Sequence, residues 1–186
     1  MNFDQSPMLV IWEATQACDL ACVHCRASAQ SERSPSELST EEGYRLLDEI
    51  RSFGEPLMVF TGGDPLKRPD LFDLIRYSVK LGLRTNVTPS ATPLLTNEAI
   101  DKFKEAGVTR MAISVDGHDA ASHDDFRGIP GTFDRAMTAL RHARDIGLDT
   151  QFQTTVTRRN RDHLPEISEI VREMGSKMWS LFFLIV

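Results

Sequence analysis

Short apolar segments alternate with amphipathic helical patterns along nearly the whole of this 186-residue chain. Strand and helix follow each other five times, and a sixth strand comes last. Consecutive parallel strands need crossover helices of this kind, so the order predicts parallel βα units. Right-handed crossovers place every helix on one face of a sheet that curls. We therefore expect an α/β fold, a partial (βα)6 TIM-type barrel of parallel strands with outer helices. The expected strands cover residues 8–15, 57–60, 84–88, 110–115, 148–156 and a segment from about 177, and the expected helices cover 39–53, 70–81, 96–106, 132–146 and 163–174.

The three cysteines of the chain lie close together, directly after the first predicted strand. Cys18, Cys22 and Cys25 form the pattern C-x3-C-x2-C. Thiolates at this spacing are able to surround one soft metal centre. A disulfide would leave one thiol over. A structural zinc site needs a fourth ligand, for which His24 is poorly placed between two of the cysteines. We favour an iron–sulfur cube with one iron left open, and zinc stays as the alternative.

The other unusual segments also follow predicted strands. Gly62 and Gly63 follow the second strand, a proline-flanked loop at 89–93 follows the third, and a long loop at 116–131 follows the fourth. Ligand sites of barrels and open parallel sheets lie at the carboxyl ends of the strands. We therefore expect these segments to form one site with the cysteine loop. The two glycines would let a ligand approach the backbone closely, although an ordinary turn explains them equally well.

Several polar side chains near this edge have two interpretations each. Ser114 and Asp116 end the fourth strand and point to the same face. Arg127 either holds a carboxylate in a bidentate manner or is solvated.

The histidines of the long loop are interpreted as surface residues. His118, His123 and Asp124 are expected to be solvated rather than bound to a metal. On the fifth strand, polar and apolar residues alternate over 151–156, which indicates either a polar barrel interior or a half-exposed edge strand.

Composition limits the classes of function. The net charge of −6 argues against nucleic-acid binding by bulk electrostatics. No export signal and no apolar stretch of roughly 20 residues is present, so no membrane association is expected. Clustered free thiols point to the reducing cytoplasm. The apolar run at 181–186 resembles a buried strand, and we expect residues 1–186 to be a fragment consisting of one domain.

The cysteine motif after the first strand and Gly-Gly-Asp-Pro after the second resemble the radical S-adenosylmethionine (radical SAM) superfamily. The stretch His-Asp-Asp-Phe-Arg-Gly-x-Pro-Gly from 123 to 131 resembles the branch that carries a C-terminal SPASM or twitch domain. The resemblance implies a radical SAM core domain without its SPASM-like domain. It also implies that Cys18, Cys22 and Cys25 ligate three irons of a [4Fe-4S] cluster, and that S-adenosylmethionine (SAM) chelates the fourth iron.

The resemblance further implies residues that bind SAM. His24 occupies the position whose backbone meets the adenine. Gly62, Gly63 and Asp64 match the Gly-Gly-Glu-Pro motif that receives the SAM amino group, although Asp64 replaces the usual glutamate.

Three more residues complete the implied site. Ser114 and Arg127 match the pair that holds the SAM carboxylate in SPASM-type enzymes. Asn86 matches part of a Thr-Asn motif on the third strand, but Val87 stands where many relatives have glycine. The chain has no further cysteines, so it holds no ligands for the auxiliary clusters of that branch.

The implied reaction is reductive cleavage of SAM to a 5′-deoxyadenosyl radical, which abstracts hydrogen from a substrate. No general acid or base is assigned. The implied partners are a tetrapyrrole, peptide or quinone-cofactor precursor as substrate, and an electron donor such as a flavodoxin or ferredoxin. The alternative is a non-catalytic iron–sulfur or zinc-binding domain.

Overall fold

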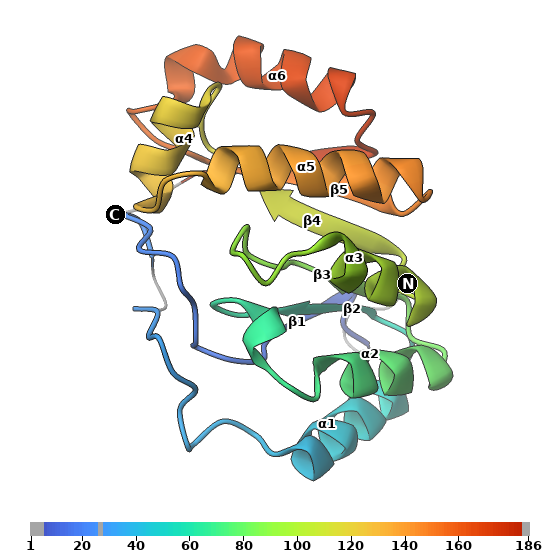
Figure 1. Cartoon of the computed structure of the whole chain (residues 1–186). Helices are drawn as coiled ribbons and strands as arrows, with labels where there is room; N and C mark the ends of the chain where they lie inside the picture. Colours follow the sequence, from blue (N-terminus) through green and yellow to red (C-terminus); the bar gives the residue numbers. More distant parts are fainter. Residues whose placement is uncertain (1–5, 26–27, 184–186) are drawn as a thin grey trace.

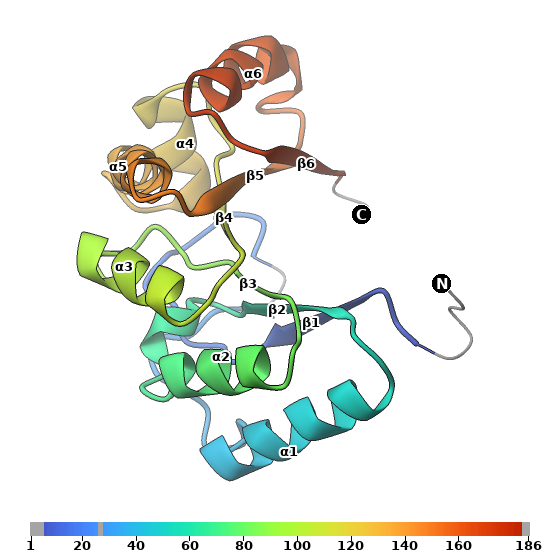
Figure 2. The ribbon, with the colours of Figure 1, turned by 90° about the vertical axis from the view of Figure 1, so that its right-hand side faces the viewer.

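The computed structural model describes residues 6–25 and 28–183 of the chain. Six strands form one parallel sheet in the order β1-β2-β3-β4-β5-β6. The sheet curls, and the helices cover its outer face, as Figures 1 and 2 show from two sides. This confirms the predicted partial barrel. The strands are β1 (Leu9–Glu13), β2 (Leu57–Thr61), β3 (Thr85–Val87), β4 (Arg110–Ser114), β5 (Asp149–Val156) and β6 (Met178–Phe183). The helices are α1 (Thr40–Ser52), α2 (Leu71–Lys80), α3 (Asn97–Glu105), α4 (Ala120–Arg127), α5 (Thr132–Asp145) and α6 (Leu164–Glu173), with 3-10 turns η1 (Pro65–Lys67) and η2 (Arg161–His163).

The hydrophobic core lies between the sheet and the outer helices. Alternate residues of a strand point to opposite faces, and the outward set is mainly apolar and largely buried. Phe60 on β2, Ile113 on β4 and Phe152 on β5 belong to it, and the last two are paired in register. Each such side chain contributes about 1.5–3 kcal/mol by leaving water. The inward set is thereby left free to face the barrel interior.

Two helix starts follow local sequence signals. The sequence predicts a capping box from Ser39 and Glu42, and the structure has it at the start of α1. Thr96 accepts a hydrogen bond from the backbone N–H of Ala99 and caps α3. Such caps stabilise a helix by about 1 kcal/mol each.

The prediction of one long loop at 116–131 is wrong, because this segment contains α4. Asp119 and Ser122 form a capping box at its start, and Gly128 ends it in the left-handed conformation, with φ of 73°. Only two residues of α4 are buried, His123 and Phe126, so its apolar pattern is too short to be recognised.

The sequence pattern also predicts Thr132 as the cap of α5, and this prediction is wrong. Thr132 is the first residue of the helix rather than its cap, and the N-cap residue is Gly131. The carboxylate of Asp124, on α4, accepts hydrogen bonds from the backbone N–H of Phe133 (2.8 Å), the hydroxyl of Thr132 (2.6 Å) and the backbone N–H of Gly131. Asp124 therefore joins α4 to α5 and is not the solvated residue expected from the sequence.

Candidate functional site

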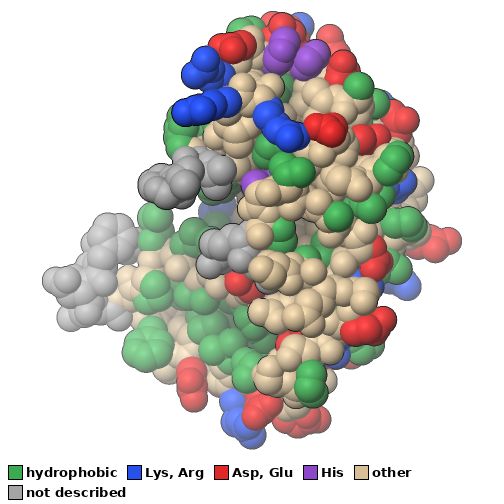
Figure 3. Space-filling view, turned by 90° about the vertical axis from the view of Figure 1, so that its left-hand side faces the viewer, with side chains coloured by type: hydrophobic (Ala, Val, Ile, Leu, Met, Phe, Trp, Pro, Cys, Tyr) green, Lys and Arg blue, Asp and Glu red, His purple; other side chains and the backbone are tan. Residues whose placement is uncertain are grey.

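The segments singled out in the sequence converge at the carboxyl end of the sheet. Figure 3 views the molecule from this side and shows a hollowed surface, with mainly apolar side chains below it and charged ones above. The hollow has two adjoining parts, which share Gly62, Gly63 and Arg127 in their walls. One part is completed by the three cysteines and His24, and the other by residues that include Ser114, His123 and Gln153. The segments therefore lie together at one edge of the sheet, as the sequence predicts.

The cysteine loop is held by backbone pairing on both sides. Cys18 donates its backbone N–H to the carbonyl of Gln30 (2.7 Å), next to an isolated β-bridge. Farther on, the N–H groups of Ala21 and Val23 donate to the carbonyls of Arg127 (3.2 Å) and Phe126 (3.1 Å). The carboxyl end of α4, which was not expected from the sequence, thus supports the loop between Cys18 and Cys25.

The three thiols are free and differ in exposure. Cys18 is buried, Cys22 is half-buried and Cys25 is exposed. Burial raises the pKa of the Cys18 thiol, and a hydrogen bond from the backbone N–H of Leu20 (3.4 Å) works in the opposite direction. Within 6–25 and 28–183, no three side chains form a site preformed for a single metal ion. Three free thiols around one hollow do fit a cluster that spreads its thiolate ligands over several irons.

Gly62 and Gly63 pack against the backbone that leads to the cysteines. A Cβ on Gly62 would lie 2.3 Å from the carbonyl oxygen of Thr15, and one on Gly63 would lie 2.5 Å from that of Ala17. Gly63 also donates its N–H to the carbonyl of Thr15 (2.8 Å). No side chain fits at either position, so the glycines bring this segment directly against the cysteine loop.

Asp64 lies behind the hollow rather than in its wall. Its carboxylate is fully buried and accepts hydrogen bonds from the Thr92 hydroxyl (2.6 Å) and the backbone N–H groups of Leu66 (3.1 Å) and Ser90 (3.4 Å). Burial raises the pKa of this carboxyl, and the hydrogen bonds oppose that effect. Its contact with SAM stays a prediction.

Asn86 also lies away from the residues that line the hollow. Thr85 and Val87, its neighbours on β3, point outward, since Thr85 bonds Ser78 of α2 and Val87 lies in the core. Asn86 therefore faces the barrel interior. Its Oδ1 is buried and has no hydrogen-bond partner among the described residues.

Ser114 and Arg127, the expected carboxylate pair, do line the same part of the hollow. The Arg127 side chain is 12% exposed and forms an ion pair with the fully buried carboxylate of Asp116. Burial alone would lower the pKa of Arg127, but Asp116 and Cys22 together outweigh it and raise that pKa. Arg127 also approaches the sulfur of Cys22, with Nη1 at 3.6 Å. One arginine therefore links the thiols to the second part of the hollow.

Hydrogen bonds from other parts of the chain hold Asp116 in place. Its Oδ1 accepts a hydrogen bond from the backbone N–H of Thr155 on β5 (2.7 Å), and its carbonyl accepts one from Asn160 (2.9 Å). The Arg127 guanidinium is thus held in place by groups anchored on β4 and β5. Sequence reasoning placed Asp116 on the correct face but missed this role.

His123 and His24 are both packed within the site. His123 is 1% exposed, so its interpretation as a solvated residue is wrong. Burial, aided by the charge of Arg127, lowers the pKa of His123 to about 4. His24 packs its ring against Phe126 at 4.4 Å between ring centroids, and burial also lowers its pKa. His118, by contrast, stacks on His163 outside this hollow.

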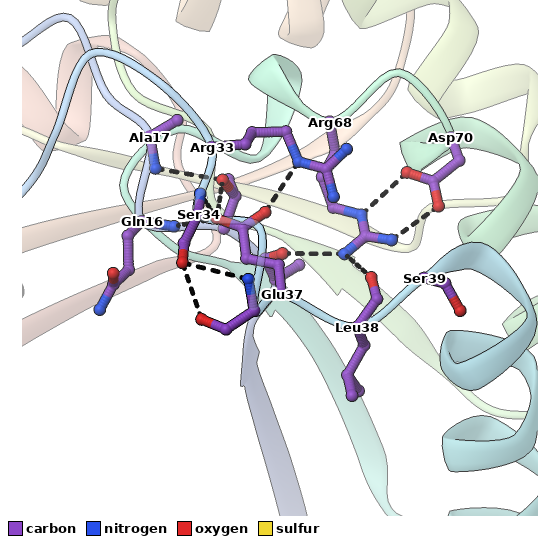
Figure 4. Close-up of polar contacts among 12 residues, drawn as sticks. Gln16, Ala17, Arg33, Ser34, Glu37, Leu38, Ser39, Arg68 and Asp70 are labelled. Carbon is purple, nitrogen blue, oxygen red and sulfur yellow. Dashed lines mark hydrogen bonds and ion pairs between the residues drawn. The ribbon is translucent and has the colours of Figure 1, made fainter.

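Two charged residues that the sequence did not reveal hold the entrance to the cysteine loop (Figure 4). Arg68 is 2% exposed and donates to the carbonyls of Ala14 and Leu38, both at 3.0 Å, and to Asp70. Glu37 accepts hydrogen bonds from the Thr15 hydroxyl and several neighbouring groups. Charged residues are mostly exposed, so the sequence alone does not indicate that Arg68 is buried and Glu37 half-buried.

Comparison with known proteins identifies a family with this geometry. The model of the Radical SAM superfamily matches residues 12–171. The AdoMet-dependent heme synthase of Oleidesulfovibrio alaskensis is 44% identical over 184 residues, 98% of this chain and 47% of that protein. The PqqA peptide cyclase of Rhodopseudomonas palustris is 34% identical over 164 residues, 88% of this chain and 43% of that protein. The chain spans about half the length of these relatives.

A solved structure agrees with the fold. Streptococcus suis SuiB bound to S-adenosylmethionine gives a TM-score of 0.85 at 16% identity, over 98% of this chain and 42% of that chain. The family model and the two sequence relatives confirm the resemblance to the SPASM-type branch. They also confirm the predicted cofactors, since the superfamily uses a [4Fe-4S] cluster and SAM.

Among the described residues, no helix is both long and apolar enough to span a membrane.

Proposed function

We propose that this chain, which belongs to the radical SAM superfamily, is a catalytic domain that cleaves SAM reductively at a [4Fe-4S] cluster. One observation carries the proposal. The three thiols line one part of a hollow, the residues expected to bind the SAM carboxylate line the other, and Gly62, Gly63 and Arg127 border both. A non-catalytic metal-binding domain would have no need of the second part.

The residues of the chain have separate tasks in this proposal. When bound, the cluster and SAM supply a 5′-deoxyadenosyl radical that takes hydrogen from a substrate. Cys18, Cys22 and Cys25 hold the cluster as thiolates, so loading releases protons from the thiols. Ser114 and Arg127 hold the SAM carboxylate. We assign no general acid or base, because the chain's contribution is to bind, orient and exclude water.

Substrate, partner and compartment are also proposals. Identity is higher to the heme synthase than to the peptide cyclase, which favours a tetrapyrrole over a peptide or a quinone-cofactor precursor as the substrate class. A flavodoxin or ferredoxin would supply the electron. We further propose that residues 1–186 form one radical SAM core domain, and that it works in a reducing cytoplasm where its thiols stay free.

Anaerobic spectroscopy tests the central proposal. The protein is reconstituted with iron and sulfide, reduced, and examined by EPR with and without SAM. We expect a [4Fe-4S]⁺ signal that changes when SAM is added, and 5′-deoxyadenosine as a product. Cys22→Ala should lose the cluster, whereas His118→Ala, outside the hollow, should keep it. A cluster signal indifferent to SAM would support an electron carrier, and one bound zinc without iron would support the zinc alternative.

A further inference from the structure

Five buried polar side-chain atoms have no hydrogen-bond partner in the described part of the chain. They are His24 Nδ1, Asn86 Oδ1, Arg110 Nε, His123 Nε2 and Arg127 Nε. A buried polar atom left without a partner costs about 1–3 kcal/mol, so a native structure that keeps one at a cavity invites the question of what completes it. Among the side chains that line the part of the hollow with Ser114, that of His123 is 1% exposed.

The proton on the His123 ring can be assigned from its other nitrogen. The backbone N–H of Asp116 donates to Nδ1 of His123 at 3.1 Å. A nitrogen that accepts a hydrogen bond carries no proton, so the neutral ring must carry its proton on Nε2. Burial and the nearby Arg127 charge keep the ring neutral, outweighing Asp116 and Asp124. The free Nε2 is therefore an N–H donor, and it requires an acceptor.

The surrounding charges define the kind of acceptor. The carboxylate of Asp116 is paired with Arg127, and that of Asp124 accepts from the start of α5. Neither is available to Nε2. The wall of this part of the hollow adds the Ser114 hydroxyl, and the Nε–H of Arg127 is a second donor without a partner. Donors that converge where the described residues of this part of the hollow include no carboxylate fit an anionic oxygen of a ligand.

We propose that His123 donates its Nε2–H to the carboxylate of bound SAM, as a third donor beside Ser114 and Arg127. This inference rests on the proposed function. A neutral donor suits this position, because a second cation beside the Arg127 guanidinium would be repelled by it. His123 is then a ligand-binding residue contributed by α4.

Two substitutions test the roles of the two ring nitrogens of His123 separately. In His123→Asn, the side-chain oxygen takes the place of Nδ1 and still accepts from Asp116, but no donor reaches the position of Nε2. In His123→Gln, the amide nitrogen takes the place of Nε2, and the acceptor for Asp116 is lost. His118→Asn, on the stacked pair outside the hollow, is the matched control.

The test is equilibrium binding of SAM to the anaerobically reconstituted variants, together with thermal unfolding. We expect His123→Asn to bind SAM roughly ten- to hundredfold more weakly, as for one lost hydrogen bond to a charged group, with near-normal stability. His123→Gln should bind SAM more tightly than His123→Asn and unfold at a lower temperature. Decarboxylated SAM lacks the acceptor. Its affinity should therefore differ between wild type and His123→Asn much less than the affinity for SAM does.

The outcomes distinguish this inference from the proposed function. A wild-type protein that holds a cluster but does not bind SAM would refute the proposed function, and this inference with it. SAM binding that is equally strong in wild type and His123→Asn would refute the role of His123 alone. An equal loss for SAM and decarboxylated SAM would show that His123 acts on the shape of the hollow or on the rest of the ligand, and not on the carboxylate.

Discussion

Replacing Arg68 with methionine tests how firmly the entrance to the cysteine loop is held. The guanidinium donates to the carbonyls of Ala14 and Leu38, pairs with Asp70, and lies 5.4 Å from the ring centroid of Trp12. Methionine fills most of the volume but supplies no donor. The Asp70 side chain, 13% exposed, would then be an ion without its partner, and two carbonyls would lose a donor.

The magnitude follows from removing one partner of a buried ion pair. Such changes cost about 3–5 kcal/mol, a large part of the 5–15 kcal/mol by which domains are stable. For a chain of this length, that corresponds to a fall in Tm of roughly 6–20 °C. Because Ala14 is next to the end of β1, the same change should loosen the segment leading to Cys18 and lower the yield of cluster on reconstitution.

Denaturant unfolding and iron content provide the assay, with Arg172→Met as the matched control. Arg172 also pairs with a carboxylate, that of Glu169 on α6, but its side chain is 71% exposed. Exposed pairs contribute about 0–1 kcal/mol, so the control should unfold almost as wild type does. If Arg68→Met cost no more stability than Arg172→Met, the reasoning about this buried cluster would be wrong.

Three further predictions concern the glycines, α5 and acid. Gly63→Ala should prevent cluster loading, measured by iron content, because its Cβ would lie 2.5 Å from the carbonyl oxygen of Ala17. The control is Gly82→Ala, whose Cβ would have no atom within 4 Å. It should lower the free energy of unfolding by only about 1–2 kcal/mol and keep the cluster. Asp124→Ala should lower the free energy of unfolding by about 0.5–2 kcal/mol through the loss of the cap of α5. Burial raises the pKa of Asp70, but hydrogen bonds, chiefly from its arginine partner, outweigh it and leave that pKa below its usual value of about 3.9. The stability it contributes is therefore present above that pH and lost below it, and Arg68→Met should flatten this part of the stability–pH profile.

The fold could be predicted because its signals are local. The apolar strand segments, the capping box at Ser39 and the cap at Thr96 each lie within a few neighbouring residues. Parallel topology then places the ends of all strands at one edge, which is why the cysteines, Gly62 and Ser114 were expected together. Pattern and connectivity were sufficient for the position of the site.

The side-chain contacts within the site could not be predicted in the same way. Asp124 caps α5 from eight residues before it, and Arg68 is buried by segments from three parts of the chain. His123 belongs to a short helix with a weak apolar pattern, and its burial depends on contacts with Asp116 and Phe133. These residues are polar, so composition favours the surface, and only tertiary packing overrides that preference.

The helix that the sequence did not reveal joins the two halves of the site. The last carbonyls of α4 hold the backbone on either side of Cys22, and Arg127 reaches both the Cys22 sulfur and Asp116. One turn earlier, His123 presents its donor to the part of the hollow with Ser114. A shift of α4 would therefore move the cysteine loop and the carboxylate-binding donors together. In the proposed function, the same short element would therefore position both the cluster ligands and the donors to the SAM carboxylate, which ties the proposed chemistry to a single local structure.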